Sequence, residues 1–195
     1  MHVNSIWYNF FMNSIVTYTT IVICILNYFR FTQLKKGYGY SDALIRSGAL
    51  VKPLYNKKQI WRVLTAGFVH MSISHLLLNI YCIYSIGRYI ESLLGSVSYL
   101  ILLLGSIICG NLFELYVGDE TSISGGLSSG IYGLLAFELK LIYMSGGISA
   151  ILSSPGILAT LVINLGFNFM PGIGYKAHLG GAIFGVAFIT IMSFI

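Results

Sequence analysis

Three polar groups of residues interrupt the apolar segments of this sequence, and together their side chains could perform acyl transfer. Ser128 stands among glycines at the start of one apolar segment, His178 starts another, and His75 and Asn79 share a third. A serine hydroxyl becomes a nucleophile at neutral pH when a base lies within about 3 Å, and His178 is the candidate base. Acyl transfer passes through a tetrahedral intermediate whose oxyanion needs hydrogen-bond donors. Asn79, His75 and the backbone N–H of Ser128 can supply them.

Each of these residues also has a simpler interpretation. A serine at a water–membrane boundary can be a plain helix cap. A single Asn or His within a membrane helix can hydrogen-bond across helices without any chemistry. We expect such a structural hydrogen bond for His70, which precedes the apolar segment in a loop. Polar residues on three different segments would rarely converge by accident, because each of them costs insertion energy.

Helical spacing places these side chains on shared faces. Residues three, four and seven apart lie on one side of a helix, which groups His75 with Asn79, Ser128 with Tyr132, and His178 with Gly181 and Gly185. Small residues let helix backbones approach closely in lipid, so the glycines would allow His178 to reach a serine on a neighbouring helix. Beyond residue 120 the only acid is Glu138. Helix rise puts it about 15 Å from Ser128, which predicts a Ser–His dyad and not a triad.

The elements that must position these residues are membrane-spanning helices. Of the 195 residues, 56% are hydrophobic and 9% are charged, with a mean hydropathy of +0.83. Soluble domains carry about a quarter charged residues, so the chain is an integral membrane protein. Six apolar segments approach the roughly 20 residues that a bilayer requires: 10–29, 74–93, 96–116, 127–144, 148–169 and 177–195. We predict one all-α domain over 1–195, a six-transmembrane-helix bundle. Within it, the fifth helix can instead begin at Pro155 with Ser154 as its cap.

The long connection 30–73 holds eight of the 11 basic residues. It is expected to lie in the interface as short amphipathic pieces, with Trp61 anchored at headgroup level. The positive-inside rule would place this loop in the cytoplasm, although the rule weakens for long loops.

Several kinds of site are not predicted. The three cysteines lie singly in apolar segments and indicate neither disulfides nor metal ligands. The basic residues alternate with apolar ones and do not form a stripe for nucleic acid. Nothing indicates a metal, nucleotide or prosthetic group, so no cofactor is expected. Residues 126–130 match the G-x-S-x-G elbow of α/β hydrolases, but the flanking membrane segments exclude that fold.

In combination, these motifs resemble those of the rhomboid intramembrane serine proteases over about residues 60–190. The matching motifs are Trp61-Arg62, His70-x-x-x-x-His75-x-x-x-Asn79, Gly87-x-x-x-Glu91, Gly126-Leu-Ser128 with Tyr132, and Ala177-His178-x-x-Gly181-x-x-x-Gly185. The resemblance implies the same roles for the dyad and the oxyanion donors, and it adds that Tyr132 packs against the ring of His178. It also implies that 170–176 form a mobile cap and that the fifth helix is a lateral gate.

The sequence departs from the family at two positions. Ser129 stands where the family usually has glycine, which raises the question of which serine attacks. The spacings to Tyr132 and from Gly126 both select Ser128. Gln59 stands where relatives often have an acid before Trp61-Arg62, so the stability of the loop can differ. The family places the first loop outside the cell, and we follow the resemblance over the charge count.

The predicted function is that of an intramembrane serine endopeptidase that cleaves single-span membrane proteins within or near their transmembrane helix. Its partners would be the lipid bilayer and transmembrane substrates. The expected location is the cell membrane as a multi-pass protein, with a prokaryotic plasma membrane favoured. The alternative is a non-catalytic rhomboid-like protein that binds membrane helices, although such relatives usually lack the serine or the histidine. A transporter is a third possibility, with Glu138 as its only plausible proton relay.

Overall fold

The computed structural model describes residues 14–54, 59–119, 121–167 and 174–194. Its helices are α2 (Ile15–Tyr38), α3 (Tyr40–Arg46), α4 (Arg62–Thr65), α5 (Ile73–Cys82), α6 (Arg88–Val117), α7 (Ser128–Leu152), α8 (Pro155–Phe167) and α9 (Tyr175–Met192). Short turns of helix occupy Lys52–Leu54, Ala66–Phe68 and Ile83–Gly87, and the two strands are β1 (Leu50–Val51) and β2 (Ile123–Ser124). The predicted all-α class is confirmed.

Four helical stretches are long and apolar enough to cross a membrane: Ile15–Tyr38, Ile73–Val117, Ser128–Leu152 and Tyr175–Met192. The second is 45 residues long and changes direction at Gly95, whose φ of 75° is not helical. Pro155–Gly166 is a shorter apolar helix. An integral membrane protein is therefore confirmed, while the count of six spans stays a prediction.

The boundaries of several helices differ from the prediction. α2 continues to Tyr38 and not 29, because no helix breaker precedes Gly37 and the added turns bury Phe31 and pack Leu34 against a second core cluster. α7 continues to Leu152 through a break at Gly146 and Gly147. α8 begins at Pro155, as the alternative boundary predicted. The predicted cap was wrong: the Ser154 hydroxyl donates to the carbonyl of Ala150 in the preceding helix, 2.9 Å away.

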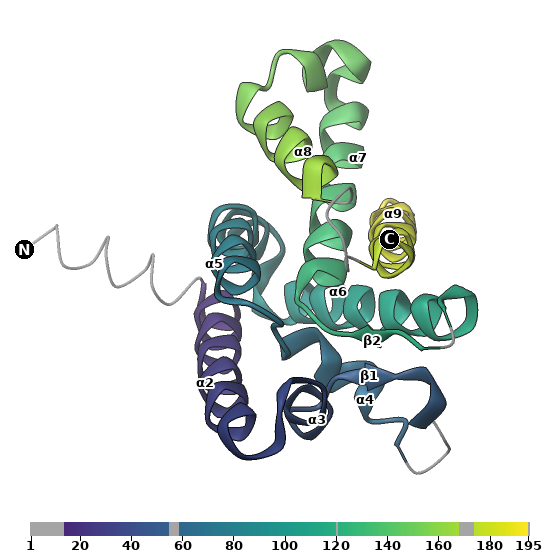
Figure 1. Cartoon of the computed structure of the whole chain (residues 1–195). Helices are drawn as coiled ribbons and strands as arrows, with labels where there is room; N and C mark the ends of the chain where they lie inside the picture. The colour runs from purple at the N-terminus through teal and green to yellow at the C-terminus, as the bar shows by residue number, and fades with distance from the viewer. Residues whose placement is uncertain (1–13, 55–58, 120, 168–173, 195) are drawn as a thin grey trace, which may run out of the picture.

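The centre of the molecule is formed by α6, α7 and α9, which pack against one another (Figure 1). Glycines make this possible. A Cβ at Gly181 would collide with the backbone of Ser129, and one at Gly185 would collide with that of Gly133. The predicted packing role of the Gly181–Gly185 pair is therefore confirmed, and it brings the start of α9 to the start of α7.

A buried carboxylate fixes the beginning of α2. Glu91 is 1% exposed and accepts hydrogen bonds from the amides of Val16 and Thr17, both 2.9 Å long, and from the Thr17 hydroxyl at 2.8 Å. The side chain thus satisfies amides at the N-terminus of the neighbouring helix α2, which have no acceptor within that helix.

The connection after α2 folds into short packed pieces and not one extended loop. The Arg62 guanidinium holds it together by donating to the carbonyls of Ile45 (2.7 Å) and Ala49 (2.9 Å) and to Oε1 of Gln59 (2.8 Å). The side-chain amide of Gln59 therefore accepts the hydrogen bond from Arg62 that an acid at this position would accept. Trp61 is 47% exposed. Its predicted place at headgroup level stays a prediction.

A two-stranded antiparallel ladder joins this connection to the segment before α7. Leu50 pairs with Ser124 and Val51 with Ile123 (Figure 1). The ladder fixes the path of the chain just before the glycine turn that leads into α7.

Candidate active site

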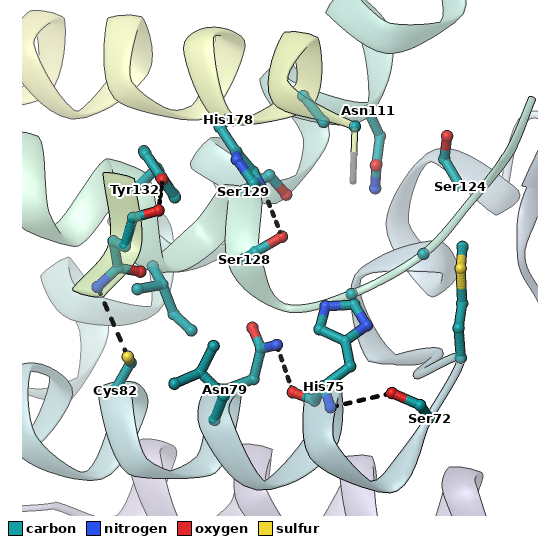
Figure 2. Close-up of a pocket in the computed structure, with 18 of the residues that line it drawn as sticks. Ser72, His75, Asn79, Cys82, Asn111, Ser124, Ser128, Ser129, Tyr132 and His178 are labelled. Carbon is teal, nitrogen blue, oxygen red and sulfur yellow. Dashed lines mark hydrogen bonds between the residues drawn. The ribbon is translucent and has the colours of Figure 1, made fainter. Parts of the chain in front are cut away.

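One cavity of about 390 Å³ contains most of the residues singled out by the sequence. Its wall is formed by α5, the β2–α7 turn, α7, α8 and the start of α9. Figure 2 shows Ser128 between His178 on one side and Asn79 and His75 on the other. His70, Trp61, Arg62 and Gly181 do not line it.

The turn before α7 requires glycine at position 126. Gly126 has a φ of 135°, which residues with a side chain rarely adopt. A Cβ there would also lie 2.7 Å from Cε1 of His75. The amide of Gly126 donates to the carbonyl of Ala66 at 2.9 Å, which anchors the turn. The turn therefore sets Ser128 at the first residue of α7, and the His75 ring packs against the turn.

Ser128 and His178 are hydrogen-bonded. Oγ of Ser128 lies 2.8 Å from Nε2 of His178 (Figure 2). When the imidazole carries its hydrogen on Nδ1, Nε2 accepts from the serine hydroxyl. Ser129 is 1% exposed, and its hydroxyl has no hydrogen-bond partner among the described residues. The serine that reaches the histidine is thus Ser128.

The ring of His178 lies flat against the ring of Tyr132. The two centroids are 4.2 Å apart and the planes differ by 7°. The phenol of Tyr132 in turn donates to the backbone carbonyl of Asn164 in α8, at 2.6 Å. Both rings are therefore held from two sides, and the orientation of the imidazole depends on α7 and α8 together.

The expected oxyanion donors face the same space. Ser128 begins α7, so its N–H has no acceptor within the helix. Nδ2 of Asn79 donates to the carbonyl of His75 at 2.7 Å, which leaves one amide hydrogen for another acceptor. The start of α5, which carries His75, is capped by the hydroxyl of Ser72, 3.1 Å from the His75 amide.

His70 is buried beneath this site and does not reach Ser128. Its ring meets that of His75 edge-on, with centroids 5.1 Å apart. Burial lowers the pKa of His70 to about 3, assisted by the nearby His75 and opposed by the Phe68 backbone. Neither ring nitrogen has a well-formed hydrogen bond within the described residues. The structural hydrogen bond expected for His70 is thus reduced to a weak contact with the Phe68 backbone.

Comparison with known proteins places this geometry in a family. The Rhomboid domain matches residues 57–194, which is most of the chain. The chain belongs to the rhomboid family. It is 32% identical to RHOMBOID-like protein 7 of Arabidopsis thaliana over 72% of its length, and 29% identical to the Rhomboid protease GluP of Bacillus subtilis (strain 168) over 87%.

A third relative, the Inactive RHOMBOID-like protein 8 of Arabidopsis thaliana, is 30% identical over 68% of the chain. The matches cover 46%, 33% and 38% of these three relatives, so the chain spans less than half of the length of each.

In this rhomboid no carboxylate side chain lines the cavity, as far as the structure describes the chain. Glu138 lies further along α7, and its Oε2 has no hydrogen-bond partner among the described residues. No group of three or more His, Cys, Asp or Glu side chains could hold a metal ion within the described ranges. The cavity wall thus holds the hydrogen-bonded pair Ser128 and His178, and no carboxylate among the described residues of the wall completes a triad.

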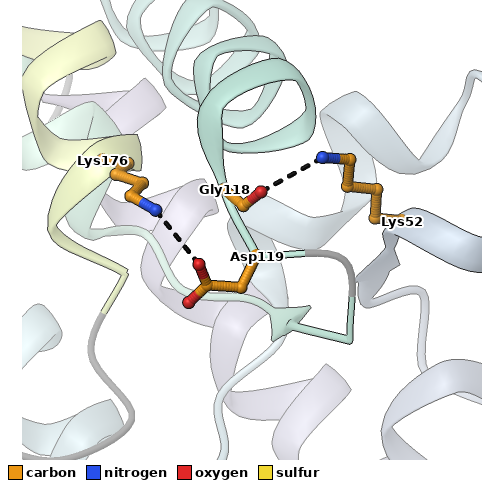
Figure 3. A network of polar contacts seen from close by, with 4 residues as sticks. All are labelled: Lys52, Gly118, Asp119 and Lys176. Carbon is orange, nitrogen blue, oxygen red and sulfur yellow. Dashed lines mark hydrogen bonds and ion pairs between the residues drawn. The ribbon is translucent and has the colours of Figure 1, made fainter.

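A polar network ties the segment before β2 to both of its neighbours. Nζ of Lys52 donates to the carbonyl of Gly118 at 3.1 Å, and Nζ of Lys176 lies 3.3 Å from Oδ1 of Asp119 (Figure 3). Lys176 stands two residues before His178, so the ion pair connects the α6–β2 segment to the start of α9. Asp119 is 86% exposed, and such exposed pairs contribute little stability.

Sequence reasoning missed Asn164, which lines the cavity from α8. The available signal was an amide in an otherwise apolar helix, where polar groups are costly and mark contacts or function. The predicted cap at 170–176 lies mostly outside the described residues; Gly174 belongs to the cavity wall.

Proposed function

We propose that this rhomboid is an intramembrane serine endopeptidase that uses Ser128 as nucleophile and His178 as its only general base. Membership of the family supports protease-type function. The observation that carries the proposal is the 2.8 Å hydrogen bond between Oγ of Ser128 and Nε2 of His178 inside a cavity. That contact is the pairing of nucleophile and base that acyl transfer requires.

In the first half of the reaction, Oγ of Ser128 attacks the carbonyl carbon of the scissile peptide while Nε2 of His178 takes its proton. The carbonyl oxygen then carries the negative charge of the tetrahedral intermediate. The N–H of Ser128 and the second amide hydrogen of Asn79 are the proposed donors to that oxygen, and His75 is the third. The partial positive charge at the start of α7 favours the anion as well.

The intermediate collapses when the C–N bond breaks and His178 returns the proton to the leaving amine. Ser128 is left as an acyl ester. A water molecule then attacks the ester, His178 takes its proton, and the ester bond breaks to release the carboxylate product and restore the serine hydroxyl. The histidine thus acts in turn as base and acid in both halves, as in other serine hydrolases.

The proposed substrates are single-span membrane proteins. A helix in lipid hides its peptide carbonyls in internal hydrogen bonds, so the cleaved segment must unwind locally. Substrates with Gly, Pro or polar residues near the cut, and a small residue at it, should therefore be preferred. We place the enzyme in the cell membrane, with a prokaryotic plasma membrane favoured, and with the first loop on the outer side.

The alternative is a non-catalytic protein that binds membrane helices. The relative named Inactive RHOMBOID-like protein 8 shows that similarity over this region does not by itself carry activity. The hydrogen-bonded serine and histidine favour the protease, because a binding protein has no need for them.

The test is cleavage of a single-span substrate in liposomes by the wild-type protein and by Ser128→Ala. The proposal expects two fragments with the wild type and none with the variant. Binding of the substrate without cleavage by the wild type would instead support the non-catalytic alternative.

A further inference from the structure

Asn164 is a buried polar residue of α8 for which the proposed reaction has no role. It is 6% exposed, in a helix whose other described side chains are nearly all apolar. Its Nδ2 donates to the carbonyl of Thr160 at 2.8 Å and lies 3.7 Å from Sγ of Cys82 in α5. An amide carries two hydrogens, so both contacts can form at once. The side chain therefore ties α8 to α5 across the cavity.

The backbone of Asn164 makes a second connection, to α7. α8 ends at Phe167, so the carbonyl of Asn164 is among the last four, which have no N–H partner within the helix. The hydroxyl of Tyr132 occupies this acceptor at 2.6 Å. The partial negative charge at a helix C-terminus strengthens such a bond. The position of α8 thus determines where the Tyr132 hydroxyl is held.

The position of Tyr132 affects the reacting atoms because its ring contacts the ring of His178. It lies parallel to the His178 ring at 4.2 Å. When His178 accepts the proton of Ser128, the resulting cation rests on the face of a phenol, and aromatic faces attract cations. Donating its hydroxyl hydrogen to a carbonyl leaves the phenol ring richer in electrons. No carboxylate lines the described cavity wall, so the stacked Tyr132 ring is the group on this wall that can support the charge of the imidazolium from its face.

We propose that Asn164 is a positioning residue that holds Tyr132 against His178 and makes the reactivity of Ser128 depend on α8 being docked on α5 and α7. The inference rests on the proposed function, because it assigns a role within the same dyad. When α8 is in place, the imidazole has one orientation and a ring to support its charge. Displacement of α8 releases the Tyr132 hydroxyl and lowers the reactivity of the serine.

The test is the rate at which a fluorophosphonate probe labels the full-length protein in detergent. Asn164→Leu removes the link to α5, and Tyr132→Phe removes the link to α8 while keeping the ring. Each should slow labelling about 3- to 10-fold, the effect of losing one neutral hydrogen bond from the activated state. The double variant should be no slower than the slower single one, because both changes interrupt the same path. Val162→Leu, at a position of the same helix that is 70% exposed and makes none of these contacts, should label at the wild-type rate.

Two further readouts separate positioning from loss of fold. Cys82→Val removes the contact from the α5 side and should slow labelling in the same direction as Asn164→Leu. With a transmembrane substrate, Tyr132→Phe should lower kcat while KM stays within about twofold, as expected for an interaction made only in the transition state. Wild-type labelling by Asn164→Leu, or a double variant slowed by the product of the single effects, would overturn this inference alone. A wild-type protein that is never labelled would overturn the proposed function and this inference with it.

Discussion

At the scale of single residues, Asn79 is the donor whose role is least obvious from its resting contacts. One of its amide hydrogens is used by the His75 carbonyl, and its Oδ1 is buried without a partner among the described residues. The bond to His75 fixes the amide, so its second hydrogen is held in one direction before any substrate arrives. Such a preorganised donor is worth more than a free one, since it needs no reorganisation during the reaction.

We therefore expect Asn79→Ala to lower turnover by about 10- to 1000-fold, the range for losing one oxyanion donor. The fluorescence of a quenched substrate in liposomes would measure turnover, and thermal unfolding would show that the variant still folds. Asn79→Asp is a matched control, because it keeps the volume and loses the hydrogen. Full activity in both variants would exclude Asn79 from the oxyanion site.

The buried His70 predicts a dependence of stability on pH. Its pKa is about 3 in the folded protein and about 6.5 when exposed, so the unfolded chain binds the proton first as the pH falls. Stability is then present above pH 6.5 and is lost as the pH falls from there towards 3, by up to about 1.4 kcal/mol for each pH unit.

This loss can be isolated by comparing the unfolding free energies of the wild type and His70→Phe between pH 7 and pH 4.5. As the pH falls, the unfolding free energy of the wild type should decrease relative to that of His70→Phe. The reason is that phenylalanine binds no proton in the folded or the unfolded state. A difference that stays constant over this range would mean that His70 is not buried in its neutral form.

At the scale of elements, the polar anchors of the helices were harder to predict than the helices themselves. Apolar periodicity predicted the helices but not the C-terminal boundary of α2. The last turn of that helix contains basic residues, which are compatible with both helix and loop. The anchoring role of Glu91 was not predicted, because its partners Val16 and Thr17 are 75 and 74 positions away in the chain. No local pattern in the sequence predicts such a distant contact.

Glu91→Ala should destabilise the protein by about 1–3 kcal/mol, since it leaves the amides of Val16 and Thr17 without an acceptor in the interior. Unfolding in mixed detergent would measure the effect. Asp42→Asn, which changes an exposed acid on α3, is the control and should stay within about 0.5 kcal/mol of the wild type. Equal stability of the two variants would show that Glu91 does not hold α2.

At the scale of the whole molecule, the sequence was sufficient for the membrane class, the family and the Ser128, His178, Asn79 and His75 side chains of the cavity, but not for Asn164. The choice of Ser128 over Ser129 followed from helical spacing, and the structure gives the same serine the contact with His178. The link through Asn164 could not be predicted, because it depends on how α8 sits between α5 and α7. Helix packing of that kind is set by tertiary contacts that no short motif encodes.

The central claim is that Ser128 and His178 form a reactive dyad without a carboxylate. The most direct measurement is to label the protein with a fluorophosphonate and to locate the modified residue by mass spectrometry of its peptides. The account predicts an adduct on Ser128 in the wild type, the same adduct at a similar rate in Glu138→Gln, and none in His178→Ala. An adduct on Ser129, or a Glu138→Gln protein that folds but reacts no faster than His178→Ala, would contradict it.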